Sequence, residues 1–175
     1  MIPTPYLLFL GDAPDQLSAK VAQGIKDWRP ENAVGQLRMP GCNADLNIED
    51  LTLEQAFEKG ARTMVIGVAN RGGYISEAWK VILIEALKTG FDLASGLHNL
   101  LRDEPDLVTH AKKYSRHLHD VRIPTVEYPI ANGKKRSGKR CLAVGTDCSA
   151  GKMYTAMAMD RLMQERGMKS TFRAT

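Results

Sequence analysis

The chain has 175 residues, of which 43% are hydrophobic and 25% are charged, proportions that are ordinary for a globular domain. Its net charge of +4 is concentrated in residues 134–140 (KKRSGKR), so a broad nucleic-acid-binding surface is not expected. No apolar run approaches the ~20 residues that span a bilayer, and no signal peptide is recognisable. The three cysteines lack the spacing of a disulfide framework or a zinc site. We therefore expect a cytoplasmic protein without membrane contact.

Short apolar segments alternate with amphipathic ones through the first part of the chain. Strands are predicted at 6–11, 34–39, 63–69 and 91–96, and helices at 15–28, 52–60 and 76–90. In the first helix, Leu17, Val21 and Ile25 are four residues apart and are expected to form its buried face. In the second, Thr52 and Gln55 predict a capping box. The alternation predicts an α/β fold with a Rossmann-like, parallel, doubly wound sheet.

The chain changes character after residue 98. Residues 99–119 are polar and are expected to be helical, and residues 120–129 contain two prolines and are expected to form an extended connector. Glycines and a dense run of charges make 131–140 the best candidate for a linker. The linker separates an N-terminal domain at 1–130 from a second unit at 141–175.

The second unit is predicted to consist of a strand at 141–145, a loop, and a helix at 153–167. One strand and one helix cannot bury their own apolar faces. We therefore expect the unit to be the incomplete start of a P-loop-type α/β domain, and the chain to be an N-terminal fragment.

The loop GTDCSAGK, residues 145–152, is similar to the phosphate-binding loop G-x-x-x-x-G-K-[ST]. In such a loop the backbone N–H groups and the N-terminus of the following helix attract an anion, and the lysine reaches the outer phosphates. An incidental Gly-Lys at a turn is the alternative. The candidate phosphate-binding residues are Gly145, Thr146, Asp147, Cys148, Ser149, Gly151 and Lys152.

The loop departs from the usual pattern at two places. It has one extra residue, as in the enlarged loop of dethiobiotin synthetases, which it resembles, and Met153 replaces the hydroxyl that binds Mg²⁺. Ser149 or Thr155 could substitute, but neither sits at the usual position. No metal site is expected, and a ligand with a diphosphate but no transferred phosphoryl group, such as coenzyme A, suits this loop.

Several segments together resemble one bacterial family. They are PYLLFLGDAP, VIGVANRGG, ASGLH, KRSGKR and VGTDCSAGKMYTA, and they occur in the family's order along essentially the whole chain. The best-described members are D-glutamate N-acetyltransferases of the DgcN type, which pair a Rossmann-like domain with a P-loop-like domain and are longer than this chain. The resemblance implies acetyl transfer from acetyl-CoA to the amino group of D-glutamate.

The loops that follow the predicted strands supply the candidate acceptor site, because ligands of such sheets bind at the carboxyl ends of the strands. Asn70, Arg71, Gly72 and Gly73 are the candidate substrate-binding residues, with Arg71 as a bidentate partner for a carboxylate. The alternative is a turn in which the glycines serve only the backbone.

His98 and Asp12 are the candidate catalytic residues. His98 follows the strand 91–96 and is the residue type that most often removes a proton, although a structural role is the alternative. Asp12 could orient the amine of the acceptor or cap the helix that follows it. Asp147 could bind substrate or shape its loop.

Other polar groups favour plainer interpretations. His110, His117 and His119 indicate a solvated basic segment rather than a metal site, because on a helix the last two lie on different faces. Cys148 could be a covalent nucleophile, but no histidine is adjacent to it, and direct transfer is favoured. The basic stretch 134–140 could bind the 3′-phosphate of coenzyme A or imitate a nuclear import signal, and a solvated linker is favoured.

Two further functions remain open from the sequence alone. One is an ATP-dependent ligase or kinase that acts on a small carboxylate with Mg-ATP. The other is a non-catalytic module that binds a small anion. The oligomeric state is also open, with a homo-oligomer among the alternatives.

Overall fold

The structure of the chain is a computed structural model that describes residues 2–123, 127, 133–135, 137–146 and 150–173. The chain divides into two compact units, Met1–Glu127 and Tyr128–Thr175, each with its own internal packing. No helix in the described residues is long and apolar enough to cross a membrane.

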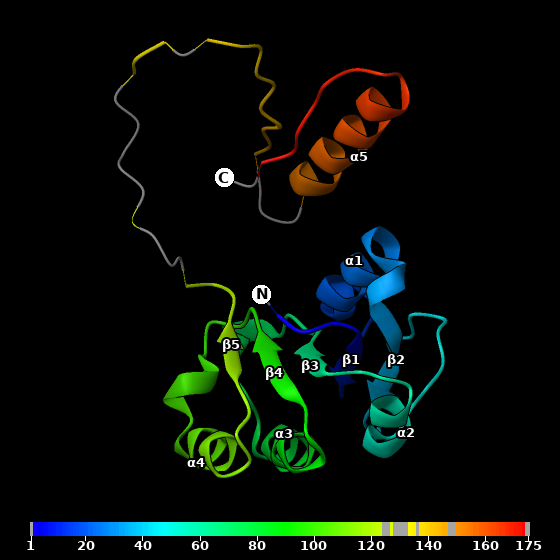
Figure 1. Ribbon diagram of the computed structural model, residues 1–175, viewed down its shortest axis with the longest axis vertical. Coiled ribbons are helices and arrows are strands. Elements are labelled where there is room, and N and C mark those ends of the chain that lie inside the picture. Colours follow the sequence, from blue (N-terminus) through cyan, green and yellow to red (C-terminus); the bar gives the residue numbers. More distant parts are fainter. Residues whose placement is uncertain (1, 124–126, 128–132, 136, 147–149, 174–175) are drawn as a thin grey trace. The chain divides into compact units, whose positions relative to one another are not determined.

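The first unit contains one sheet in which all strands are parallel and lie in the order β2-β1-β3-β4-β5 (Figure 1). The predicted parallel, doubly wound α/β architecture is confirmed, and the direction of winding changes between β1 and β3. The strands are β1 (Tyr6–Gly11), β2 (Ala33–Arg38), β3 (Thr63–Ile66), β4 (Asp92–Ser95) and β5 (Leu118–Asp120).

Helices cover both faces of this sheet, with α1 on one face and the next three helices side by side on the other (Figure 1). The α-helices of this unit are α1 (Lys20–Trp28), α2 (Leu53–Glu58), α3 (Glu77–Thr89) and α4 (Pro105–Lys113). Short 3-10 helices lie at Leu17–Ala19, Pro30–Asn32, Arg71–Gly73 and Leu101–Asp103.

Local signals in the sequence explain where these helices begin and end. Thr52 and Gln55 form the predicted capping box, in which each side chain bonds to the other residue's backbone N–H. Helix α3 begins after Ser76, whose Oγ accepts a hydrogen bond from the backbone N–H of Trp79. It ends at Gly90, which has the left-handed conformation (φ 114°) that favours glycine.

The buried face predicted for the first helix is wrong in part. The α-helix begins only at Lys20, and the side chains of Leu17 and Val21 are 70% and 39% exposed. The small residues Ala19 and Ala22 are completely buried instead. Small side chains allow the helix backbone to approach the sheet closely, which the spacing of large apolar residues does not reveal.

This close approach also ends β3 earlier than predicted. The backbone N–H of Ala22 donates to the carbonyl of Gly67 (3.1 Å), and the N–H of Ala69 donates to the carbonyl of Ser18 (2.7 Å). Gly67 and Ala69 therefore bond to the first helical turns, although the N–H of Gly67 still donates to the carbonyl of Phe9 in β1 (2.9 Å).

Residues 99–119 are not one helix, and this expectation is wrong. A 3-10 turn and α4 are followed by β5, which was not predicted. Among the described residues, β5 pairs with β4 alone. The N–H of Leu93 donates to the carbonyl of His117 (3.0 Å), and the N–H of Val121 donates to the carbonyl of Ser95 (3.0 Å). The strand is three residues long with a single apolar residue, Leu118, so it lacks an apolar pattern.

The second unit contains α5 (Lys152–Glu165), close to the predicted helix. The predicted strand at 141–145 is absent, and the side chains of Leu142 and Val144 are 67% and 79% exposed. A strand needs a neighbour to satisfy its backbone groups, and the described residues of this unit supply no second strand.

Replacing Gly67 by alanine should destabilise the fold, because a Cβ at this position lies 2.3 Å from the Cβ of Ala22. Overpacking of this kind costs about 1–3 kcal/mol. Chemical denaturation of Gly67→Ala measures the loss. Gly96→Ala is the matched control, since its Cβ meets only the Val121 side chain, at 3.6 Å. Equal stability of the two variants would contradict the proposed close contact.

Candidate functional site

The candidate acceptor site lies at the carboxyl edge of the sheet. Strands β1, β3 and β4 are neighbours, so the loops that follow them emerge side by side. The sequence placed candidate residues in all of these loops, and the hydrogen bonds of the described residues show which of them meet.

Asp12 follows β1 and is exposed, but one of its oxygens is held. The indole N–H of Trp79 donates to Asp12 Oδ1 at 2.8 Å. Asp12 is not the cap of this segment, because the N–H and the hydroxyl of Ser18 both donate to Asp15 Oδ1 instead. The backbone hydrogen bond from Ser18 is the main cause of the lowered pKa of Asp15.

The loop after β3 contacts the loop after β4. Gly73 is buried in a left-handed conformation (φ 60°), and a Cβ at this position would lie 2.8 Å from the backbone nitrogen of His98. The carbonyl of Gly73 accepts a hydrogen bond from the N–H of Asn99 (2.8 Å). His98 itself exposes its side chain. The structure therefore brings the predicted residues Gly73 and His98 together.

Asn70 is joined to the same loop by both its backbone and its side chain. Its carbonyl accepts a hydrogen bond from the N–H of Gly73 (3.2 Å), and its Nδ2 donates to the carbonyl of Tyr74 (2.9 Å). Its Oδ1 is buried and has no hydrogen-bond partner among the described residues. Gly72 is exposed, with φ 81°, and the side chain of Arg71 lies outside the described part of the structure.

A polar network that the sequence did not reveal fastens the loop after β4 to α3. Asn99 Nδ2 donates to Glu104 Oε1 (2.9 Å), and Glu104 Oε2 lies 3.1 Å from Lys80 Nζ. Lys80 also pairs with Glu77 (2.6 Å), and the hydrogen bonds that it donates to Glu77 and then to Glu104 raise the pKa of Lys80. These charges hold the loop that carries His98.

In the second unit, the two ends of the candidate phosphate loop approach each other. Gly151 has φ 86° and immediately precedes α5, which begins at Lys152. The side-chain carbons Cγ and Cδ of Lys152 lie 3.2 Å from the position that a Cβ on Gly145 would take. Thr146 is exposed. The remaining candidates Asp147, Cys148 and Ser149 lie outside the described residues.

The histidines are arranged differently from the expectation. His117 and His119 are two residues apart in an extended segment, so their side chains lie on the same face of it. Their rings stack with centroids 6.0 Å apart. Both approach the buried carboxylate of Asp92, at 3.5 and 3.4 Å. Within the part of the chain that is described, no group of three or more His, Cys, Asp and Glu side chains is arranged to hold a metal ion.

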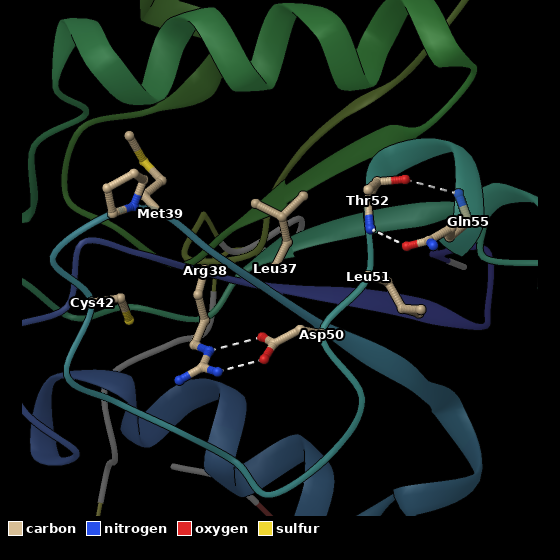
Figure 2. Close-up of a pocket in the computed structure, with 9 residues that line it drawn as sticks. Leu37, Arg38, Met39, Cys42, Asp50, Leu51, Thr52 and Gln55 are labelled. Carbon is tan, nitrogen blue, oxygen red and sulfur yellow. Dashed lines mark hydrogen bonds and ion pairs between the residues drawn. The ribbon is translucent and has the colours of Figure 1, made fainter.

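A pocket of about 560 Å³ lies at the carboxyl end of β2 (Figure 2). Arg38 reaches across it to Asp50, donating from Nε (2.8 Å) and from a second nitrogen, and it also lies 3.4 Å from Asp45. Since two carboxylates face one guanidinium, this pocket is poorly suited to an anion. It contains none of the residues that the sequence singled out for substrate or cofactor.

Two domain-family models match the chain. Residues 37–124 match a domain of unknown function, DUF1611_N, described as a Rossmann-like domain. Residues 129–175 match the companion DUF1611_C, described as a P-loop domain. Together they agree with the Rossmann-like sheet of the first unit and with the phosphate-loop assignment in the second.

Curated relatives match along the full chain. A protein of Tritonibacter scottomollicae named D-glutamate N-acetyltransferase is 70% identical over 175 residues, which are 100% of this chain and 53% of that relative. A protein of a Pseudoalteromonas species with the same name is 43% identical over 174 residues, 99% of this chain and 52% of the relative. The chain thus spans about half the length of the curated relatives it matches.

A solved structure has the same fold. The crystal structure of a DUF1611 family protein from Anabaena variabilis superposes with a TM-score of 0.76 at 24% identity. The match covers 94% of this chain and 51% of that chain.

Gly73→Ala should disturb the candidate site, whereas Gly72→Ala should not. Both glycines have positive φ and both substitutions carry a backbone penalty of about 1–2 kcal/mol, but only the Cβ at Gly73 meets the backbone of His98. The measurement is the NMR resonance of the His98 ring together with the free energy of unfolding. An identical response in the two variants would argue against a packed contact between these loops.

Acid should weaken the Arg38–Asp50 pair. The hydrogen bond from Arg38 lowers the pKa of Asp50 in the folded chain. The ion pair therefore stabilises the fold fully above the pKa of the unfolded Asp, about 3.9, and this stabilisation is lost as the pH falls through the lower pKa of the folded chain. Since the pair is partly exposed, its contribution is under about 1 kcal/mol. Urea midpoints between pH 7 and pH 2 should fall less steeply in Arg38→Gln than in the control Lys112→Gln. Parallel curves would contradict the prediction.

Proposed function

The chain belongs to the DUF1611 family, and on that premise we propose that the protein transfers the acetyl group of acetyl-CoA to the amino group of D-glutamate. The observation that carries this proposal is the 70% identity, over all 175 residues, to a relative named D-glutamate N-acetyltransferase. A second relative with the same name and 43% identity supports it. The proposal also implies an acyltransferase that works in the cytoplasm, where acetyl-CoA is available.

The carboxyl edge of the sheet offers the groups that the acceptor needs. D-Glutamate carries two carboxylates and an ammonium group. Under the proposal, Arg71 and the backbone of Gly72 and Gly73 bind a carboxylate, with Asn70 beside them. Asp12 binds the ammonium group, since its carboxylate is exposed at the carboxyl end of β1.

His98 is the proposed base. Its side chain is exposed, and its Cδ2 lies 3.0 Å from the position that a Cβ on Gly73 would take, which supports a role for the imidazole beside the proposed carboxylate site. The imidazole takes a proton from the ammonium group, and the free amine then attacks the thioester carbon of acetyl-CoA. A C–N bond forms, the C–S bond breaks, and the thiolate of coenzyme A leaves with the electron pair and takes up the second proton, which the acylated nitrogen gives up.

The phosphate loop of the second unit is the proposed handle for acetyl-CoA. The left-handed Gly151, the N-terminus of α5 and the cationic Lys152 are the features that attract a diphosphate. The close approach of Lys152 to Gly145 supports a shared role of these two residues in holding such a group. Thr146, Asp147, Cys148 and Ser149 complete the proposed site.

Release of the coenzyme A thiol tests this function. The protein, prepared at the full length of its curated relatives, receives acetyl-CoA with D-glutamate, with L-glutamate or with neither. We expect release with D-glutamate and neither with L-glutamate nor without an acceptor, because the name of both relatives specifies the D-enantiomer. His98→Gln should lower kcat by about 10²–10⁴-fold. The proposal would be overturned if D-glutamate caused no more thiol release than acetyl-CoA without an acceptor.

A pair of lysine variants tests the role of the loop in the same assay. Lys152→Ala should raise the KM for acetyl-CoA, since the cation near the phosphates is lost. Lys169→Ala removes an exposed lysine of the same unit outside the loop, and its KM should not change.

A further inference from the structure

A hydrogen bond joins Trp79, in the first turn of α3, to Asp12, which follows the carboxyl end of β1 and is 67 positions away in the sequence. From it we infer that Trp79 is a positioning residue: its indole N–H holds Asp12 so that the second carboxylate oxygen forms a subsite for the primary ammonium group of the acceptor. The inference rests on the proposed function and adds to it a residue and a chemical role.

The indole of Trp79 is held firmly on several sides. Its side chain is only 2% exposed, and its ring makes an edge-to-face contact with Phe9, with centroids 5.6 Å apart. Its backbone N–H donates to the Oγ of Ser76, the residue that caps α3. The ring also packs against Gly11, where a Cβ would lie 2.7 Å from the ring and where φ is 53°. A glycine is therefore required at the position before Asp12.

These contacts leave the indole N–H little choice of direction. A buried indole N–H needs an acceptor, because an unpaired one costs about 1–3 kcal/mol. Asp12 Oδ1, at 2.8 Å, is that acceptor. The carboxylate is consequently anchored through one oxygen to the rigid first turn of α3.

Two buried carboxylates, one in β4 and one in β5, have different partners. Asp120 is buried and accepts from the N–H groups of Leu101 and Arg102 and from the Arg102 side chain. Asp92 is buried and accepts from the N–H of His117. These carboxylates serve the fold.

Asp12 is exposed at the carboxyl edge, and no described residue bonds its Oδ2. A carboxylate that is anchored through one oxygen and open at the other accepts hydrogen bonds from a cation. A primary ammonium group is the cation that a D-amino acid supplies, and charge-assisted bonds of this kind are strong and directional.

The bond itself is tested by NMR of the indole N–H groups. The Trp79 resonance is the one that disappears in Trp79→Phe. It should move in Asp12→Asn, because the indole N–H then loses the charged acceptor of its hydrogen bond. Addition of D-glutamate should also shift it, while the resonance of Trp28 stays in place.

Kinetics of the full-length protein test the positioning role. Trp79→Phe keeps an aromatic ring but loses the donor, and we expect kcat/KM for D-glutamate to fall about tenfold with an unchanged KM for acetyl-CoA. Asp12→Asn should show a similar or larger loss. Because Trp79 acts through Asp12, the double variant Trp79→Phe/Asp12→Ala should be no worse than Asp12→Ala alone. Trp28→Phe is the matched control and should retain wild-type constants.

The outcomes separate the subsite from the reaction. Turnover of D-glutamate with no shift of the Trp79 resonance and with wild-type kinetics in Trp79→Phe would overturn the subsite and keep the acetyl transfer. A shift on addition of D-glutamate without any thiol release would keep the subsite and overturn the transfer. Neither shift nor turnover would overturn both. Additive losses in the double variant would remove the positioning role from Trp79.

Discussion

Strand β1 is the element on which the rest of the first unit depends. It pairs with β2 on one side and β3 on the other, and its residues Leu7 to Leu10 have no exposed surface. Burial of a large apolar side chain contributes about 1.5–3 kcal/mol. The neighbouring loops bond to its end: the N–H of Gly67 donates to the carbonyl of Phe9 (2.9 Å), and that of Met39 to the carbonyl of Gly11 (2.8 Å). The carboxyl edge is thereby organised around the residues that precede Asp12.

The sequence predicted what local chemistry determines. The apolar run that forms β1, the capping box of α2 and the stop of α3 at Gly90 depend on neighbouring residues, and the structure has them where the patterns placed them. Strand β5 was not predicted because it depends on backbone hydrogen bonds to β4. Its three residues show no apolar pattern that would indicate this pairing. The exposed Leu17 shows the same limit of sequence-based prediction. Amphipathic spacing identifies the apolar face of a helix but does not show whether another element packs against that face.

The candidate site divides in a similar way. Asn70, Gly73 and His98 were predicted because each follows a strand of a parallel sheet, and the loops after β3 and β4 meet because these strands are neighbours. The Trp79 bond to Asp12 has no local signal, because a tryptophan in an amphipathic helix is equally well explained as core. A buried indole N–H nevertheless always raises the question of its acceptor, and here that question leads to the edge of the sheet.

The chemistry proposed for the phosphate loop explains its departure from the common pattern. In phosphoryl transfer, charge develops on the phosphates, and a hydroxyl after the lysine helps to hold the Mg²⁺ that neutralises it. In acetyl transfer the bond that breaks is the C–S bond of the thioester, so the diphosphate of the donor serves only as a handle. A left-handed glycine, a helix N-terminus and Lys152 supply what a handle requires. Met153, exposed in the first turn of α5, occupies the position of the metal-binding hydroxyl, and this substitution is tolerable for an acyl donor but costly for ATP hydrolysis.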